Sequence, residues 1–448
     1  MNKEKKEVVK VNQITEGVIW QQILIFFLPI LFGTFFQQLY NTADAMIVGH
    51  FLGKQALAAV GGTTGTLINL LVGFFVGLSS GATVVISQHY GANKEDKVQW
   101  AVHTSIAFSI LGGIVLTVVG IGCSRWMLDL MNTPDDVVNH ALIYMRVYFL
   151  GTIGNLIYNM GSGILRAVGD SKRPLYFLII CCIVNIILDL ELVLGFKMGV
   201  LGVAVATLIA QGISAVLVSV ALMYHTAGLK LIPREIRIHK SVLKNMLAIG
   251  LPTGIESSMY SISNVIVQAA LNGFGVDTMA AWAAFGKIDS LFWMINSAFG
   301  IAATTFVGQN FGAGKMDRVR KGTRESFLIS FLFCIVISAV VCIFAAPLMR
   351  IFVSAKETAV IASGVRYLRI EGAFYCGIGC LFLLYGYYRA VKKPGMSVVL
   401  TVISLGTRVA LAYILSAYIG ETGIWMAIPI GWVLADITGL VYMKFQEK

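Results

Sequence analysis

The sequence predicts an all-α integral membrane protein. We expect twelve transmembrane helices in two parallel six-helix repeats, an N-lobe and a C-lobe, around a central cleft. Hydrophobic residues make up 57% of the 448 residues, charged residues only 13%, and the mean hydropathy is +0.80. Soluble chains carry about 25% charged residues. Long apolar stretches recur along the chain, and motifs of the first half return in the second.

A spanning helix needs about 20 mostly apolar residues. Apolar stretches of this length divide the chain into the following segments. Residues 1–19 are polar and form an N-terminal segment before the N-lobe, 20–224. Its six expected spans are 20–44, 57–87, 101–122, 137–163, 175–195 and 199–224. A linker, 225–242, leads to the C-lobe, 243–443, and to a tail, 444–448. The expected C-lobe spans are 243–272, 279–308, 326–346, 360–388, 396–418 and 422–443.

Lys and Arg gather in alternate loops. If the N-terminus is cytoplasmic, the loops and termini on that side hold 24 of these residues and the opposite loops hold five. Because cytoplasmic loops are enriched in Lys and Arg, we expect both termini to be cytoplasmic, in a plasma or inner membrane. The same bias accounts for the formal charge of +11, so we expect no nucleic-acid partner.

The repeat is visible as ordered pairs of motifs. Residues 88–98 read QHYGANKEDKV and residues 309–319 read QNFGAGKMDRV. Further pairs, separated by 221 to 223 residues, are Pro29 and Pro252, Tyr144-Met-Arg146 and Tyr367-Leu-Arg369, Arg166-Ala-Val168 and Arg389-Ala-Val391, and Gly199-x-x-Gly202 and Gly420-x-x-Gly423. Six spans per half make the repeat parallel, and transporters use such repeats around a substrate cavity. The paired loops are either a conformational latch or helix caps that also supply positive charge.

Charged residues inside spans are costly and usually functional. They are Asp44, Asp189, Glu191, Glu256, Lys287, Asp289, Glu371, Arg408 and Asp436. Asn185 and Asp189 are four residues apart, so they share one face of the fifth span. Asp44 in the first span and Thr207 in the sixth lie at similar depth. Carboxylate and amide oxygens suit Na⁺ or a proton. The alternative is a structural hydrogen-bond cluster in which Asp44 acts as a cap.

A second group, in the C-lobe, is a candidate substrate cleft. Its members are Glu256, Met259, Tyr260, Trp282 and Asp289. Glu256 either binds a cationic substrate or pairs with Lys287, and Arg408 is expected to pair with an acid or with backbone carbonyls. Met and aromatic surfaces adapt to varied ligands, although any one of these side chains could instead contact lipid or another helix.

The chain resembles the multidrug and toxic compound extrusion (MATE) family over residues 15–443. The residues that carry the resemblance are Pro29, Gln38-Leu-Tyr-Asn41-Thr-Ala-Asp44, the paired QxxGA loops, Arg166-Ala-Val-Gly-Asp170 and Asn185…Asp189. The resemblance implies a cation-coupled exporter with two lobes around a cleft. In many prokaryotic members, an Asp in helix one, Asn-x-x-x-Asp in helix five and a Thr in helix six form the cation site. Asp44, Asn185, Asp189 and Thr207 match that set, and they would be the metal ligands if the ion is Na⁺.

The resemblance also separates two branches of the family. NorM-type members place a Glu in helix seven and an Asp in helix ten. In this chain Glu256 lies about one turn before that Glu, where Tyr260 stands, and helix ten reads Tyr375-Cys376-Gly377 without an acid. The chain therefore resembles the DinF-like type, with its cation site in the N-lobe.

Together these observations predict a secondary antiporter that works by alternating access of the two lobes. It would export organic, cationic or amphiphilic compounds in exchange for Na⁺ or H⁺, as a monomer and without a cofactor. The alternative is a lipid-linked saccharide flippase of the same broad superfamily. An enzyme is not expected, because the six histidines are scattered and no nucleophile–base or metal motif is visible. The seven cysteines are interpreted as packing residues.

Overall fold

The computed structural model describes residues 13–61, 63–131, 133–224 and 229–446, and within these ranges it is helical with no strand. Residues 1–12 of the N-terminal segment, 225–228 of the predicted linker and 447–448 of the tail lie outside the described residues. The N-lobe contains α1 (Ile19–Ile47), α2 (Lys54–Gly61), α3 (Thr63–Gly91), α4 (Glu95–Leu130), α5 (Asp135–Leu150), α6 (Thr152–Ala167), α7 (Lys172–Leu190) and α8 (Val200–Met223). The C-lobe contains α9 (Lys240–Asn272), α10 (Val276–Gly312), α11 (Met316–Ile343), α12 (Ala345–Phe352), α13 (Thr358–Gly372), α14 (Tyr375–Ala390), α15 (Pro394–Ile419) and α16 (Glu421–Gln446).

The number of spans is close to the predicted twelve. In the described residues nine helices are long and apolar enough to cross a membrane, and two bent helix pairs raise the number to eleven. The predicted span 243–272 corresponds to α9, which forms a helix of 33 residues but is not among those eleven. The reason is its polarity, since one face of α9 carries Glu256, Ser257, Ser261 and Asn264 toward a cavity.

The repeat extends to the backbone. The bent pairs are α5 with α6, at 49°, and α13 with α14, at 51°, and they occupy equivalent places in the two lobes. Positive φ angles recur at Gly53 and Gly275, Asn93 and Gly314, Gly169 and Lys392, and Gly199 and Gly420. Gly199 and Gly420 both precede a helix with nearly the same angles, φ 61° and ψ −140° against φ 65° and ψ −148°. Only glycine adopts this region without strain, which explains why this residue type recurs there.

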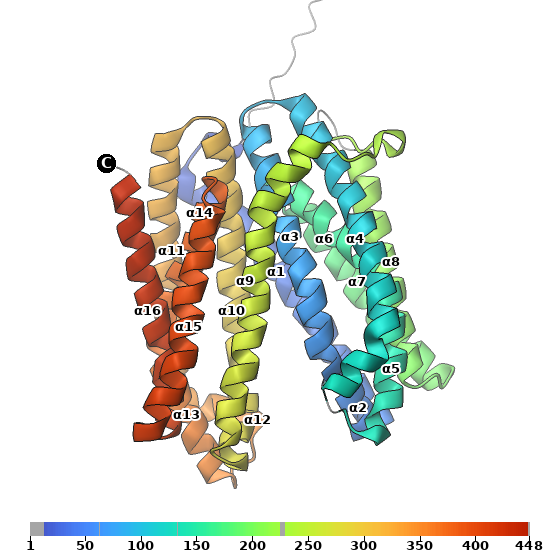
Figure 1. Ribbon diagram of the computed structural model, residues 1–448, viewed down its shortest axis with the longest axis vertical. Helices are drawn as coiled ribbons and strands as arrows, with labels where there is room; N and C mark the ends of the chain where they lie inside the picture. The colour runs from blue at the N-terminus through green and yellow to red at the C-terminus, as the bar shows by residue number, and fades with distance from the viewer. Residues whose placement is uncertain (1–12, 62, 132, 225–228, 447–448) are drawn as a thin grey trace, which may run out of the picture.

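Figure 1 shows the two lobes side by side, with α9 and α10 against α3 between them. We call the end where α1 begins and α16 ends the termini end. From that end to the middle of α3 and α9 the lobes meet through small residues, because a Cβ on Gly81 would collide with Met246 O and one on Gly77 would lie 2.7 Å from Gly254 Cα. Phe27 of α1 and Phe299 of α10 stack at 3.8 Å between ring centroids in the same part of the molecule. The lobes are therefore closed against each other at the termini end.

The N-terminal segment crosses this closed end. Residues 13–17 run as a strap whose carbonyls are held by the start of α11: the Arg318 guanidinium donates to Gly17 O at 2.8 Å and to Glu16 O at 2.7 Å. Lys315 Nζ donates to Thr15 O at 3.0 Å. The Ile14 side chain is buried, and it lies beside Gly169 of the N-lobe. The strap thus contacts both lobes.

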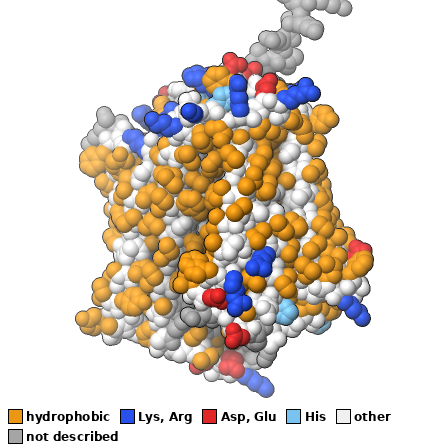
Figure 2. All heavy atoms as spheres, turned by 45° about the vertical axis from the view of Figure 1, so that its right-hand side comes forward, with side chains coloured by type: hydrophobic (Ala, Val, Ile, Leu, Met, Phe, Trp, Pro, Cys, Tyr) orange, Lys and Arg blue, Asp and Glu red, His pale blue; other side chains and the backbone are white. Residues whose placement is uncertain are grey.

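The outer flank is apolar, as a surface in lipid requires. Large hydrophobic side chains such as Val118, Phe331 and Val336 are more than half exposed. Figure 2 shows hydrophobic side chains over the body of the molecule, with Lys and Arg mainly toward its two ends. A soluble protein rarely exposes so large an apolar surface, so this belt is the part that faces the bilayer.

Candidate functional site

The four residues predicted to bind a cation are buried together in the N-lobe. Asp44 lies in the last turn of α1, Asn185 and Asp189 on one face of α7, and Thr207 on α8. Their exposed fractions are 5%, 1%, 0% and 3%. The Asp44 carboxyl lies within hydrogen-bonding reach of the side chains of Asp189 and Thr207, and α7 packs against both α1 and α8. We call these four side chains the N-lobe cluster.

The N-lobe cluster has unused hydrogen-bonding capacity. Among the described residues, no partner meets hydrogen-bond geometry at either carboxyl oxygen of Asp189, at Oδ1 of Asp44 or at the amide atoms of Asn185. The two carboxyls lie beside each other and can share a hydrogen bond only when one of them is protonated. Thr207 Oγ1 donates to Val203 O at 3.0 Å. Among the described side chains, no Lys or Arg acts on either carboxyl. Because a buried polar group without a partner costs free energy, this arrangement favours a bound cation.

A small cavity adjoins the cluster. Its volume is about 40 Å³, and its lining includes Tyr40, Asn185, Thr207 and Gln211. An organic ligand needs a pocket of roughly 300–1,000 Å³, whereas a single water or ion needs far less. The N-lobe space therefore fits a small ion and not an organic molecule. The described residues contain no group of three or more His, Cys, Asp or Glu placed to hold a metal, so a metal here would rely on Asn185 and Thr207 beside the two acids.

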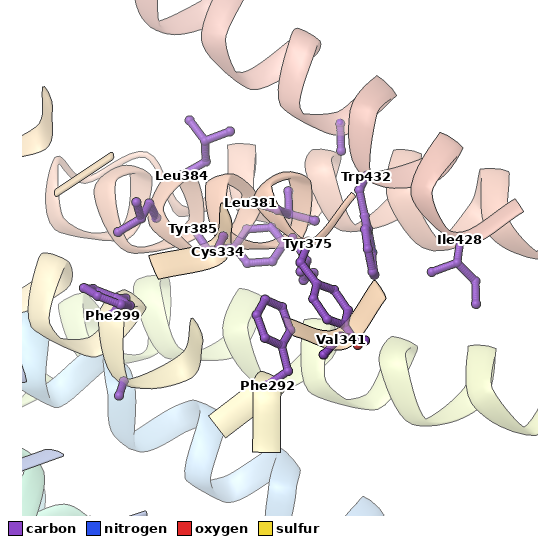
Figure 3. Close-up of a cluster of buried hydrophobic side chains, with 14 of the residues drawn as sticks. Phe292, Phe299, Cys334, Val341, Tyr375, Leu381, Leu384, Tyr385, Ile428 and Trp432 are labelled. Atoms are coloured by element: carbon purple, nitrogen blue, oxygen red, sulfur yellow. The ribbon is translucent and has the colours of Figure 1, made fainter. Parts of the chain in front are cut away.

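The C-lobe holds a second buried acid group, which sequence reasoning did not assemble. Asp289 of α10 accepts hydrogen bonds from the Tyr367 hydroxyl at 2.5 Å and the Tyr375 hydroxyl at 2.6 Å. Figure 3 shows Tyr375 beside Phe292, and their rings stack at 3.7 Å. Glu371 is 2% exposed and acts electrostatically on Asp289. We call Asp289, Glu371 and their neighbour Arg408 the C-lobe triad.

Arg408 supplies the positive charge of the C-lobe triad. It lies on α15, is 6% exposed, and acts electrostatically on both Glu371 and Asp289. Its Nη1 donates to Asn264 Oδ1 at 2.9 Å. The expectation that Arg408 pairs with an acid or with backbone carbonyls therefore becomes more specific: it faces two acids and a side-chain amide. The C-lobe triad contains two carboxyls and one guanidinium.

A cavity with polar and aromatic lining lies between this triad and α3. It has a volume of about 620 Å³ and is lined by aromatic, acidic and hydroxyl side chains. They include Trp282, Phe285, Trp293, Tyr260, Glu256, Asp289, Arg408 and, from the N-lobe, Asn69 and Gly73. Four of the five predicted cleft residues line it. Met259 is not among the residues that line it.

Of the two alternatives for Glu256, the ion pair with Lys287 does not form, because another cation takes that place. Both carboxyl oxygens of Glu256 accept from Arg389 Nη2, at 2.6 and 2.7 Å. Lys287 instead lines a separate cavity with Asp277 and Glu357. Arg389 is the last but one residue of α14, and the fold brings it to α9 across 133 residues. The repeated Arg-Ala-Val motif was the available signal, but it gave no partner for the arginine.

Comparisons with known proteins agree on one family. The MatE family model matches residues 29–190 and again residues 252–414. The chain is 29% identical over 440 residues to the "Probable multidrug resistance protein YoeA" of Bacillus subtilis strain 168, covering 96% of this chain and 94% of that one. It is 26% identical to the "Probable multidrug resistance protein NorM" of Thermotoga maritima, covering 94% and 90%.

A solved structure shares the whole fold. The "Outward-facing conformation of a multidrug resistance MATE family transporter of the MOP superfamily" superposes with a TM-score of 0.91 at 23% identity. The match covers 98% of each chain.

Proposed function

The chain belongs to the MATE (MatE) family of membrane transporters and is not an enzyme, and from this premise we propose that it is a secondary antiporter. It exports small organic compounds, cationic or amphiphilic, in exchange for Na⁺ or H⁺. Its two lobes alternate between outward-open and inward-open states, as a monomer in the cell membrane. Relatives named as multidrug resistance proteins support the class of substrate.

One observation carries the coupling part of the proposal. The N-lobe cluster buries two carboxyls and an amide whose hydrogen-bonding capacity is not fully used. Among the described side chains, no Lys or Arg acts on the two carboxyls. A buried carboxylate without a counter-ion is costly, so the cluster gains most from a cation that arrives from outside the protein. We assign that cation to Asp44 and Asp189, with Asn185 and Thr207 as neutral oxygen donors.

The orientation of the protein in the membrane indicates toward which side the lobes are closed. The excess of Lys and Arg at the termini end favours a cytoplasmic location for that end. Because the lobes touch there through Gly77, Gly81 and Phe27, the conformation corresponds to a transporter that is closed toward the cytoplasm. The cavity of about 620 Å³ lies beyond this contact and is large enough for a drug-sized compound.

In this proposal the N-lobe cluster binds the coupling cation, and the cavity in the C-lobe binds the organic compound. Cation binding between α1 and α7 removes negative charge from the N-lobe and changes how these helices pack. Only a cation that binds the two lobe arrangements with different affinity can shift their equilibrium. A monovalent ion moving inward gains about 2.3 kcal/mol per 100 mV, and that energy drives the organic compound out of the cavity in the C-lobe.

The test uses purified protein in liposomes with a fluorescent organic cation. Na⁺ and H⁺ gradients are imposed separately on the wild type, Asp189→Asn and the matched control Asp129→Asn, which changes an exposed surface acid. We expect one gradient to drive transport by the wild type and the control, and neither gradient to drive it for Asp189→Asn. Transport that survives Asp189→Asn would remove Asp189 from the mechanism. Movement of a labelled lipid-linked saccharide in place of the dye would favour a flippase.

A further inference from the structure

The repeated QxxGA loops make a reciprocal contact between the lobes at the closed end. Gln88, near the end of α3, donates from Nε2 to Ala390 O of the C-lobe at 2.8 Å. Gln309, near the end of α10, donates from Nε2 to Ala167 O of the N-lobe at 2.6 Å. Both glutamines are buried, with 6% and 0% of their surfaces exposed. Each lobe therefore gives one donor to the other and receives one.

The acceptors are chemically equivalent. Ala167 is the last residue of α6 and Ala390 is the last residue of α14. The final carbonyls of a helix have no partner within that helix, so a partner must come from outside. Each glutamine here supplies an amide hydrogen to the end of a helix in the opposite lobe. The residues of the two bonds belong to the paired QxxGA and Arg-Ala-Val motifs.

Glycines allow the approach that these bonds need. A Cβ on Gly91 would collide with Gln309 O, and a Cβ on Gly312 would collide with Gln88 O. The two glycines thus let the ends of α3 and α10 cross with backbone against backbone. The sequence motif combines both requirements, since Gln88 and Gly91, like Gln309 and Gly312, are three residues apart.

We propose that Gln88 and Gln309 are gating residues, which close the cytoplasmic side and set the population of the outward-open state. The inference rests on the proposed alternating access. When the lobes part at this end, both bonds must break, and water can then solvate the freed amides and carbonyls. Because hydrogen bonds are exchanged for bonds to water, the net cost of opening is modest. The two hydrogen bonds therefore favour the outward-open state but still allow the inward-open state to form.

The experiment measures the distance between the lobes in lipid nanodiscs, with bio-orthogonal fluorophores at the exposed positions 172 and 321. Methionine keeps the length of glutamine and removes the donor, so the variants are Gln88→Met, Gln309→Met and both together. Gln99→Met, on α4 at the same end, is the control. We expect each single variant to raise the ratio of inward-open to outward-open protein roughly fivefold, and the double variant roughly 30-fold.

The outcomes separate the gate from the transport function. A wild type with two distances and a double variant with the same ratio would overturn the gate and leave alternating access intact. A wild type with one distance under every ion condition would overturn both. Gly91→Ala is the second route to the same answer, because the added methyl should separate α3 from α10 and raise the inward-open fraction even with both glutamines present. An unchanged fraction in that folded variant would also contradict the proposal.

Discussion

The two lobes share a backbone but not a charge arrangement. In the N-lobe cluster, no Lys or Arg among the described side chains acts on Asp44 or Asp189. In the C-lobe triad, Asp289 and Glu371 share Arg408, and Asp289 is further stabilised by two tyrosine hydroxyls. The C-lobe therefore carries its own cation, whereas in the proposed mechanism the N-lobe takes one from solution. The difference teaches that two copies of a duplicated scaffold can keep the same turns and bends while their buried charges diverge.

The largest effect should come from moving the same substitution between the lobes. Asp44→Asn is expected to abolish gradient-driven accumulation, which one monovalent charge moving through 100 mV can raise roughly 50-fold. Asp289→Asn should keep the response to the gradient and change mainly the KM for the organic compound, because Asp289 lines the cavity. Initial rates in liposomes at several substrate concentrations distinguish the two. Equal loss of gradient-driven transport in both variants would contradict the proposal that the cation binds in the N-lobe and the organic compound in the C-lobe.

Removing the internal cation should make the C-lobe resemble the N-lobe. Arg408→Met leaves Asp289 and Glu371 buried without a guanidinium, and breaking a buried pair in this way costs about 3–5 kcal/mol. We expect the Tm to fall at neutral pH and to recover partly at low pH, where protons neutralise the carboxylates, or at high Na⁺. Lys287→Met, which removes a cation outside the triad, is the control. A Tm equal to that of the wild type at every pH would show that Arg408 does not balance these acids.

The equivalent tyrosines of the repeat offer a finer comparison. Tyr367 donates to Asp289, whereas Tyr144, its counterpart, has no hydrogen bond to a carboxylate among the described contacts. Tyr367→Phe should cost about 1.5–3 kcal/mol, the value for a hydrogen bond to a charged group, and Tyr144→Phe should cost less. Thermal unfolding of the two variants in the same detergent measures this. The reverse order would mean that the N-lobe depends more on its tyrosine than the geometry implies.

The smallest effect is expected at the surface. Arg125 and Asp129 form an ion pair with 53% and 55% of their side chains exposed, at an N–O distance of 3.2 Å. Such pairs contribute about 0–1 kcal/mol. Asp129→Asn should therefore leave both Tm and transport within experimental error of the wild type. A clear loss of transport would show that position 129 cannot serve as the neutral reference for the Asp189 test.

The sequence predicted the parts that depend on local pattern. Each of the twelve predicted ranges contains a helix, because apolar length is a local property, and the pair Asn185 and Asp189 follows from helical spacing alone. The C-lobe triad could not be assembled this way, since Tyr367 and Tyr375 reach Asp289 across 78 and 86 residues. The sequence suggested Lys287 as one possible partner of Glu256, whereas the fold supplies Arg389. Pairings over such separations depend on which helices pack together.

The same holds for the repeated loops, whose two interpretations differ only in tertiary contact. A cap would bond within its own lobe, whereas Gln88 and Gln309 bond to the other. No pattern within residues 88–98 distinguishes these cases. The repeat gave the correct hint that the two loops are equivalent, but the partner carbonyls at Ala167 and Ala390 belong to a different motif.

The N-terminal strap has a consequence for how the chain is made. Its carbonyls at Ile14, Glu16 and Gly17 depend on Arg318, which lies about 300 residues later. At a synthesis rate of roughly 5–20 residues per second, the ribosome reaches Arg318 roughly 15–60 s after it has made the strap. During that interval residues 14–17 have been made and Arg318 has not. Docking of the strap onto Arg318 therefore follows synthesis of the whole N-lobe and of α9 and α10.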